Sequence, residues 1–316
     1  MAVDFALVAE TLIQFLAVVF LCPFFIGVSN KLKSIVESRN GPSIIQPYYD
    51  IIKLLQKESI VPGNASNIFI YVPYLAFGVY SLISIVIPVI LPQPIYFTAT
   101  VDFLGGALLF GLAGFIKMLA AMDSGNNFSA FGVARVASFG VFSEGTLIVV
   151  FFAVALITGT INPYVTNNFL VSNPSAYLTI THVFATIAFL MLFIFESGRL
   201  PVESSGLMEF GMVEDALSYE YSGKLLAINK WGSWIKQYLL GSVLLNVFLI
   251  PWGLQTGVLG ALEDIPIMIL KWLVLIVILV FIETSLAKMR LFKIQDYLSI
   301  AFLISLFFLI FGLVIG

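Results

Sequence analysis

The sequence predicts an all-α integral membrane protein, and three observations support this prediction. Of the 316 residues, 60% are hydrophobic and only 10% are charged, whereas a soluble domain carries about 25% charged residues. The mean hydropathy is +1.05. The apolar residues also gather in runs of about 20 or more, which is the length that a helix needs to cross a bilayer.

The composition also excludes several classes of protein. The single cysteine, Cys22, can form neither an internal disulfide nor a cysteine-based metal cluster. The sequence contains no metal-binding spacing, no glycine-rich phosphate loop and no nucleophile motif. No metal ligands are therefore predicted in this chain. The 15 basic residues are too sparse for a nucleic-acid partner. The first predicted partner is therefore the lipid bilayer.

Eight apolar runs predict eight transmembrane helices in a single membrane domain, residues 1–316. Along the chain the runs cover residues 5–28, 68–92, 101–122, 134–160, 176–195, 233–254, 265–288 and 296–315. Thirteen of the fifteen basic residues lie in or beside the loops that follow the odd-numbered runs. Because basic residues favour the cytoplasmic side, these loops are predicted to be cytoplasmic, with both termini outside the cytoplasmic membrane.

Segment 43–58, in the first cytoplasmic loop, is too polar to cross a membrane and reads as an amphipathic helix. Its apolar residues recur at helical spacing, and Asp50 and Lys53 belong to the opposite, polar stripe. Pro47 suits a first helical turn. The segment is predicted to lie along the cytoplasmic membrane surface or against a partner subunit.

Charged residues inside the runs need a reason, because each costs about 2.5–3.5 kcal/mol on insertion scales. Glu144 lies ten residues into its run, about 15 Å along a helix, and Lys117 lies at comparable depth in the preceding run, so the two could pair. For Glu144 we favour a proton or ion pathway over a structural ion pair. Glu10 and Lys271 are close enough to the outer ends of their runs to reach the interface. His182 is as consistent with a packing residue as with a proton carrier.

The loop at residues 196–232 is acidic and apolar at once. It carries six carboxylates against one early arginine, Arg199, and these carboxylates are Glu196, Glu203, Glu209, Glu214, Asp215 and Glu220. Leucine, valine, methionine and phenylalanine alternate with them. Clustered carboxylates in apolar surroundings have raised, coupled proton affinities. We therefore favour a buried cytoplasmic chamber with a proton relay over a solvated acidic face.

Several motifs resemble subunit 1 of NADH dehydrogenase, the respiratory complex I family. Residues 39–42 (Arg-Asn-Gly-Pro) and 50–58 resemble its first cytoplasmic loop. Residues 196–203 (Glu-Ser-Gly-Arg-Leu-Pro-Val-Glu) and 220–223 (Glu-Tyr-Ser-Gly) resemble its acidic loop. Arg135 followed by Glu144 resembles the arginine and buried glutamate of the family's fourth helix. The resemblance covers nearly the whole chain in order.

Departures from the quinone-reducing members point to one branch of this family. Gly41-Pro42-Ser43 passes almost directly to the amphipathic segment, without the usual insertion. Gly198 stands where the family has a histidine, and Glu203 stands where it has an aspartate. The short first loop is similar to that of membrane-bound nickel–iron hydrogenases, formate hydrogenlyases and their sulfur-reducing relatives.

The resemblance implies a membrane-anchor and coupling subunit with no redox centre of its own. The NiFe and iron–sulfur centres would lie in partner subunits, a hydrogenase-like large subunit and an iron–sulfur small subunit on the cytoplasmic side. Antiporter-like subunits would flank the chain in the membrane. The residues implied in proton transfer and coupling are Glu144, Lys117, Glu196, Glu203, Glu209, Glu214, Asp215, Glu220, Arg199 and Arg135. Those implied in docking are Arg39, Asp50 and Lys53.

Two alternatives remain at this stage. The first is a quinone-binding subunit 1 of an NADH:quinone oxidoreductase, which predicts quinone-dependent activity. The second is a stand-alone secondary transporter, although neither internal repeats nor paired broken helices are evident in the sequence.

Overall fold

The computed structural model describes residues 5–92, 102–203 and 213–315, and every regular element in these ranges is helical. Six helices are long and apolar enough to cross a membrane. They are α1 (Phe5–Val36), α3 (Asn67–Val86), α4 (Phe103–Asp123), α5 (Asn127–Thr158), α10 (Val258–Ser285) and α11 (Leu291–Ile315). The chain is thus an all-helical protein of membrane type.

The remaining elements are shorter or more polar. The apolar helix α8 (Ile180–Glu196) has 17 residues, and α9 (Gly223–Val243) continues into a π-helical turn, η2 (Leu244–Leu249). The short elements are α2 (Gln46–Leu55), α6 (Pro163–Ser172), α7 (Pro174–Tyr177) and the 3₁₀ turn η1 (Asp215–Ser218).

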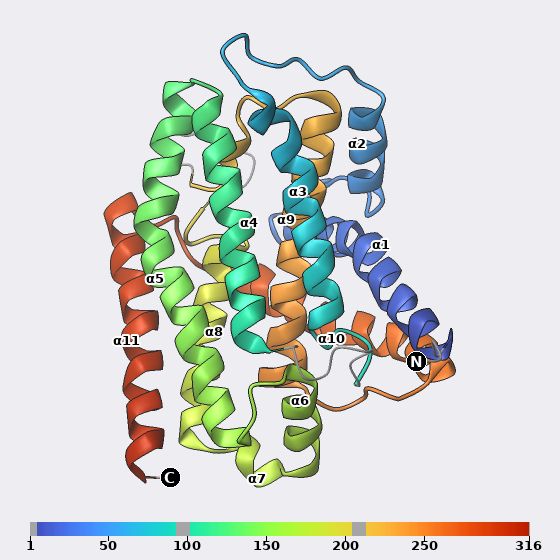
Figure 1. Ribbon diagram of the computed structural model, residues 1–316, viewed down its shortest axis with the longest axis vertical. Helices are drawn as coiled ribbons and strands as arrows, with labels where there is room; N and C mark the ends of the chain where they lie inside the picture. The colour runs from blue at the N-terminus through green and yellow to red at the C-terminus, as the bar shows by residue number, and fades with distance from the viewer. Residues whose placement is uncertain (1–4, 93–101, 204–212, 316) are drawn as a thin grey trace.

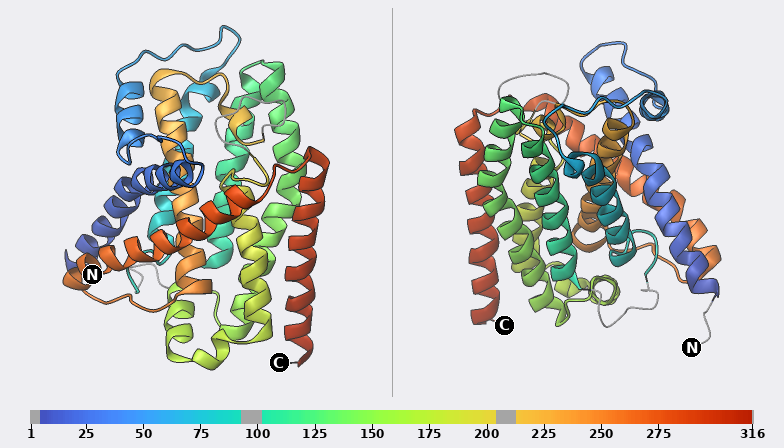
Figure 2. Two further views of the ribbon diagram at one scale, coloured as in Figure 1. Left: turned by 180° about the vertical axis from the view of Figure 1, so that it is seen from behind. Right: turned by 45° about the horizontal axis from the view of Figure 1, so that its top comes forward.

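Most of the long helices run side by side along the longest axis, whereas α1 and α10 cross the bundle obliquely (Figure 1). Seen from behind, α10 passes across α9 and α8 and ends near the start of α11 (Figure 2). Helices α1 and α10 contact each other extensively. Both chain ends lie at one end of the bundle, which we call the terminal end, and α2 lies at the opposite end, which we call the α2 end (Figure 1).

Short polar residues fix where the central helices begin. The side chains of Ser66, Asp102 and Asn126 accept hydrogen bonds from backbone N–H groups in the first turns of α3, α4 and α5. These N–H groups lack partners within their own helices, so the caps stabilise each start by about 1 kcal/mol. Gly159, at φ +68°, ends α5 in the left-handed conformation that glycine adopts without strain.

Several helices extend beyond the apolar runs that predicted them. Helix α1 continues to Val36, α5 begins at Asn127 instead of 134, and α9 begins at Gly223 instead of 233. The predicted loop 196–232 therefore ends ten residues early. The added turns carry lysine, asparagine or serine, and hydropathy cannot detect a helix that continues beyond the apolar layer. Helices α6 and α7, each with a proline in its first turn, were not predicted.

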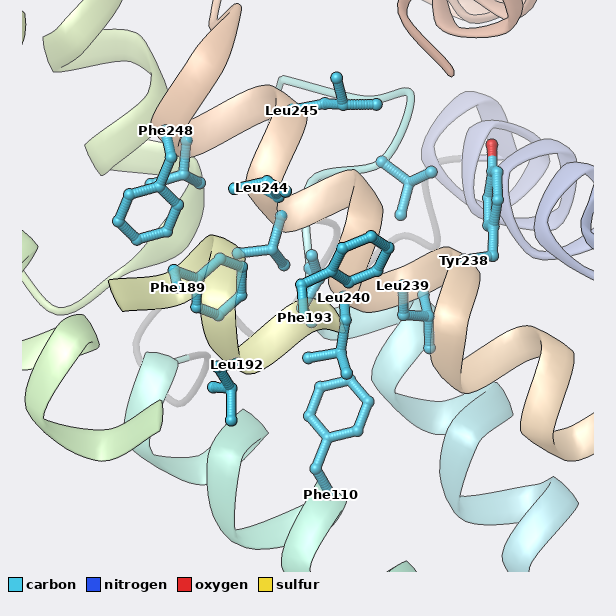
Figure 3. Close-up of a cluster of buried hydrophobic side chains, with 14 of the residues drawn as sticks. Phe110, Phe189, Leu192, Phe193, Tyr238, Leu239, Leu240, Leu244, Leu245 and Phe248 are labelled. Carbon is cyan, nitrogen blue, oxygen red and sulfur yellow. The ribbon is translucent and has the colours of Figure 1, made fainter. Parts of the chain in front are cut away.

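The core fills the space between α4, α8 and α9. Figure 3 shows Phe189, Leu192 and Phe193 of α8 facing the apolar side of α9 and η2. Tyr238 extends from α9 toward α1, where its ring stacks on those of Phe25 and Trp272 at centroid distances of 5.5 and 5.0 Å. Phe25 and Trp272 also stack on each other at 5.1 Å. We call these three rings the aromatic stack.

Gly241 makes the approach of α10 to α9 possible. A Cβ atom at this position would overlap the ring of Trp272 and lie 3.2 Å from Phe193. The glycine therefore allows Trp272 to lie directly against the α9 backbone, next to the aromatic stack.

Candidate functional site

Four charged residues from three helices and the acidic loop form a continuous chain near the α2 end. Lys236 of α9 lies 2.7 Å from a carboxylate oxygen of Glu196, at the end of α8, and 3.2 Å from one of Glu214, which precedes η1. Glu214 in turn lies 3.3 Å from the ammonium group of Lys117 on α4. Positive and negative charges alternate along the series Lys117–Glu214–Lys236–Glu196, which we call the charge chain.

Ser233 adds a neutral contact, because Lys117 donates a hydrogen bond to its hydroxyl group at 3.0 Å. The sequence left open whether Lys117 pairs with Glu144. In the structure Lys117 instead contacts a carboxylate of the acidic loop, Glu214, and a serine of α9.

Glu203 connects two parts of the acidic loop, residue 203 and residues 213–214. Its side chain is 3% exposed, and its two oxygens accept the backbone N–H groups of Val213 at 2.7 Å and Glu214 at 3.2 Å. Because Glu214 belongs to the charge chain, the position of that chain depends on the state of Glu203.

Glu203 and Glu214 have opposite electrostatic environments. Burial raises the pKa of Glu203 to about 7, against the lowering effect of its two backbone hydrogen bonds. Burial alone would also raise the pKa of Glu214, but Lys236 and Lys117 together hold it at about 2. Near neutral pH one carboxyl group therefore exchanges a proton while its neighbour stays ionised.

Two cavities meet at these residues. The larger, about 700 Å³, is mainly apolar and lies between α4, α5 and α8. The smaller, about 310 Å³, is polar and reaches Lys33, Arg199 and Glu283 near the α2 end. Both cavities are lined by the same four charged residues, which are Lys117, Glu196, Glu203 and Glu214.

Glu144 lies on the larger cavity, near the middle of α5. A Cβ atom at Gly111 of α4 would approach its carboxyl carbon to 3.3 Å, so the glycine provides the space that this side chain occupies. Of the charged groups, Glu196 and Lys236 have the strongest electrostatic effect on the carboxyl group of Glu144. The side chain of Glu144 is exposed on the face formed by α4 and α5. A carboxylate exposed in mid-helix is not stable against lipid, so this face requires a polar or protein neighbour.

Arg199 belongs to a separate group of charges. Its guanidinium contacts Glu283 of α10 at 3.1 Å and the hydroxyl of Ser29 at 2.8 Å, and Lys33 lies 3.4 Å from the same glutamate. With its oxygen turned toward Arg199, the amide of Gln237 accepts two further hydrogen bonds at 2.8 Å. Arg199 thus joins α1, α9 and α10 at the floor of the polar cavity.

The tetrapeptide 220–223 connects several segments near the α2 end. Glu220 accepts a hydrogen bond from Asn126, Tyr221 stacks on Phe69, and the Ser222 hydroxyl accepts the Ile60 N–H at 2.8 Å. A Cβ atom at Gly223 would overlap the backbone oxygen of Glu58. These contacts connect the acidic loop to the first loop, to α3 and to the start of α5.

The other predicted residues lie at the edge of this site or outside it. Asp215 is exposed at the start of η1, and Arg135 is half-buried in the third turn of α5. Glu209 lies outside the described residues. Of the predicted docking residues, Arg39 lies 3.7 Å from Glu37, and Asp50 accepts a hydrogen bond from Gln46 at 2.8 Å; both are exposed, as is Lys53.

Sequence reasoning missed the central residue, Lys236. It had been used only as one of the basic residues that set orientation. Its place on the same helix face as Asn229 and Ser233, close to a carboxylate-rich loop, is the signal that could have identified it. Glu283 lies near the end of its apolar run, and its contacts with Arg199 and Lys33 were not predicted. Across residues 5–92, 102–203 and 213–315, His, Cys, Asp and Glu do not gather into a group of three that could hold a metal ion.

Comparisons of the chain with protein families and with individual proteins agree with each other. The family described as NADH dehydrogenase matches the chain over residues 9–314. Formate hydrogenlyase subunit 4 of Escherichia coli (strain K12) is 31% identical over 287 residues, 89% of this chain and 90% of that protein. Hydrogenase-4 component C of the same organism is 30% identical, over 91% of this chain and 90% of that protein.

More distant relatives extend this comparison. A subunit of the NADH-quinone oxidoreductase of Wolbachia pipientis wMel is 26% identical over 82% of this chain and 81% of that protein. Among solved structures, a chain of the membrane-bound sulfane sulfur reductase, an archaeal respiratory membrane complex, superposes with a TM-score of 0.84. It covers 97% of this chain and 99% of that chain at 19% identity, which shows that the fold is shared.

Proposed function

The chain belongs to the NADH dehydrogenase family, and from that premise we propose that it is the membrane-anchor and coupling subunit of a complex-I-like respiratory assembly. In this role it links electron transfer in docked soluble subunits to ion translocation through the membrane. The terminal reaction is hydrogen evolution or sulfur reduction. Identity to formate hydrogenlyase subunit 4 (31%) above that to a quinone oxidoreductase subunit (26%) supports this branch.

The charge chain is the observation that carries the proposal. It joins a loop that faces the soluble partners to a cavity that reaches Glu144, and three of its members, Lys117, Glu196 and Glu214, line both cavities. A change of protonation at Glu203 alters the hydrogen bonds that hold Glu214. Movement of Glu214 then redistributes charge around Lys236, and through it around Glu196 and Glu144. Electrostatic coupling of this kind needs no redox centre in the chain itself.

In the membrane, the proposal uses eight crossings. The six long apolar helices are joined by α8 and by the continuous helix formed by α9 and η2. The α2 end faces the cytoplasm, because the loops there carry most of the basic residues. Both termini are then outside. Helix α2 lies along the cytoplasmic membrane surface with Tyr49 and Ile52 exposed toward lipid or a partner.

Partners occupy two faces of the chain. A hydrogenase-like large subunit and an iron–sulfur small subunit, which hold the NiFe and iron–sulfur centres, dock at the α2 end over Arg39, Asp50 and Lys53. Antiporter-like membrane subunits cover the face between α4 and α5, where Glu144 is exposed and needs a polar neighbour.

The contacts of the described residues support the following proposed roles. Glu203 is the titrating group, Glu214 and Lys236 transmit its state, and Glu196 and Glu144 pass protons toward the neighbouring subunits. Lys117 fixes Glu214, Arg199 fixes the floor of the polar cavity, and Glu220 fixes the loop. Asp215, Glu209 and Arg135 modulate the local charge.

The test uses the intact complex, purified from native membranes through a tag on this subunit and reconstituted in proteoliposomes. Nickel and iron content identifies the branch, and electron transfer and ion translocation are measured together. We expect Glu144→Gln to lower the ions moved per electron pair at least tenfold without loss of assembly. The matched control is Asp296→Asn, because Asp296 is an exposed carboxylate paired with Lys293 at a helix start.

A Glu144→Gln complex that assembles and translocates ions at the normal ratio would show that Glu144 is not in the pathway. Migration of the chain alone on a native gel would overturn the coupling function itself and would favour a stand-alone transporter.

A further inference from the structure

A second buried polar cluster lies toward the terminal end, away from the charge chain. Lys271 is its centre. From its place in the run this lysine was expected to reach the membrane surface, and that expectation was wrong. Its side chain is 5% exposed, and its ammonium group donates to the amide oxygen of Asn246 at 2.9 Å. The helix is apolar on all faces, so hydropathy gave no indication of which side faces the bundle.

Asn246 is held in one orientation. Its amide nitrogen donates to the backbone oxygens of Pro88 at 3.0 Å and Val89 at 2.9 Å, where the chain after α3 is not helical. The amide oxygen therefore points at Lys271. Asn246 is itself part of the π turn η2, and such turns are frequent at functional sites. The ammonium group thus has a neutral partner and keeps two N–H groups for others.

Asp264 completes the cluster. It precedes Lys271 by seven residues on α10, so both lie on one face about 10 Å apart along the helix. Its side chain is fully buried. One carboxyl oxygen accepts the backbone N–H of Gln255 at 2.6 Å, and the other has no hydrogen-bond partner among the described residues. Lys271 and Asp264 interact electrostatically.

The cluster has a short connection to the surface at the terminal end. Gln255, whose N–H group contacts Asp264, is exposed, as is Trp252 in the same connection. Among the described residues, this half also holds Glu10 on α1, Asp102 at the start of α4, His182 on α8 and the exposed Glu263 on α10. His182 contacts the backbone oxygen of Phe248, in the same π turn, at 3.3 Å.

We propose that Lys271 and Asp264 form a proton-exchange site that opens to the terminal end, the outside in the proposed orientation. The ammonium group of Lys271 releases a proton through water to the free oxygen of Asp264. The products are a neutral amine and a neutral carboxylic acid, so no net charge is created in the interior. Asp264 then exchanges its proton with the surface beside Gln255. Asn246 is the positioning residue, because it directs the lysine.

The inference rests on the proposed coupling function, and the experiment separates the two. The intact complex is reconstituted with Asp264→Asn, Lys271→Gln or Lys271→Arg, and ions moved per electron pair are compared with those of Glu144→Gln. We expect at least a tenfold loss for all three variants at unchanged electron transfer per assembled complex. Arginine keeps the positive charge but does not release a proton near neutral pH, so rescue by Lys271→Arg would indicate a purely structural lysine and overturn the proposal.

A second readout does not depend on translocation. Infrared difference spectra recorded between pH 5 and pH 9 in a Glu203→Gln background, which removes the band of Glu203, should contain the carbonyl band of a second protonated, buried carboxyl group. The band should vanish in Asp264→Asn and persist in the control Glu263→Gln. If it persists in Asp264→Asn, the proposal is wrong. If Lys271→Gln does not assemble, the double variant with Asp264→Asn, which is neutral at both positions, replaces it.

The outcomes are distinguishable. Loss of translocation in Glu144→Gln with normal ratios in Asp264→Asn and Lys271→Gln would refute this site and leave the coupling function standing. Normal ratios in all of the variants would refute the coupling function.

Discussion

The two ends of the bundle handle buried charge in different ways. Near the α2 end, each charge of the chain from Lys117 to Glu196 contacts an opposite charge, and two cavities meet there. Toward the terminal end, Lys271 contacts a neutral amide, and the polar side chains around it bond mainly to irregular backbone. The first arrangement is a network that responds when one member changes its charge. The second is a rigid frame that holds one lysine and one aspartate near each other.

This difference teaches how one helical bundle accommodates polar groups at both ends. Ion pairs in low dielectric are strong but sensitive to the loss of a partner. Hydrogen bonds between side-chain amides and the backbone are weaker individually, yet they satisfy backbone groups where a helix is interrupted. Gln14 does this for Ser84, Ile87, Ile90 and Leu91. Each of the following predictions alters one of the two arrangements.

Lys236→Met breaks the network at its centre and should have the largest effect. It leaves Glu196 and Glu214 without their shared partner, and loss of one member of a buried pair costs about 3–5 kcal/mol. Thermal unfolding of the purified complex should show a lower midpoint and reduced assembly. Partial recovery is expected when Glu214→Gln is added. A double variant as unstable as the sum of both single changes would contradict the network.

Glu203→Gln tests the titrating end of the network. The pKa of this carboxyl group is about 7 in the fold against 4.5 ordinarily, so the folded protein binds its proton more tightly than the unfolded chain. Its stabilising contribution is complete below about pH 4.5 and is lost as the pH rises through about 7. At about 1.4 kcal/mol per pKa unit, the loss is at most about 3 kcal/mol.

The measurement compares unfolding midpoints at pH 5 and pH 7.5. The variant stays neutral, so its midpoint should change less between these two values than that of the unaltered protein. Asp296→Asn serves as the control and should retain the full dependence. Identical pH profiles for Glu203→Gln and the unaltered protein would disprove the assignment.

Asn246→Ala tests the rigid frame. It removes the partners of Pro88, Val89 and Lys271, and an unsatisfied buried polar group costs about 1–3 kcal/mol. Hydrogen exchange in η2 and in residues 84–92 should accelerate. Exchange around Glu214 should not change if the two ends are independent, so acceleration there would show that they are coupled.

Ser222→Ala should have the smallest effect. The hydroxyl accepts the Ile60 N–H at an exposed position, and such a bond contributes about 0.5–1.5 kcal/mol. Faster hydrogen exchange in residues 57–62 with unchanged exchange in α4 would confirm that the contact only clasps two loops. Slower electron transfer in this variant would indicate that docking also depends on it.

The sequence predicted the helical membrane class and the segments that carry charge, because both depend on composition and on apolar length. It placed Glu144, Lys117 and the acidic loop in one region, and the structure brings them to one cavity. Their pairing could not be predicted, since it depends on how helices far apart in the chain rotate about their axes. Lys236 and Lys271 illustrate the point: both are lysines in apolar helices, and only the fold shows that one meets two carboxylates and the other an asparagine.

Helix ends were predicted less well for a related reason. Hydropathy measures the thickness of the apolar layer and not the length of a helix, so α1, α5 and α9 continue through turns rich in polar residues. Helices α6 and α7 are stabilised by proline at their first turns and by contacts with η2 and α8, which no local pattern reveals.

The aromatic stack has a consequence for the membrane voltage. Phe25, Tyr238 and Trp272 stack beside Arg199, which lines the polar cavity, and Trp272 directly follows Lys271 in α10. Where water enters the polar regions on either side of the stack, the electric field concentrates across the apolar layer of rings between them. A charge that crosses this layer experiences most of the roughly 2.3 kcal/mol that 100 mV supplies. The three rings thus insulate the two polar regions from each other, and a wider gap between the rings would let ions leak across the membrane.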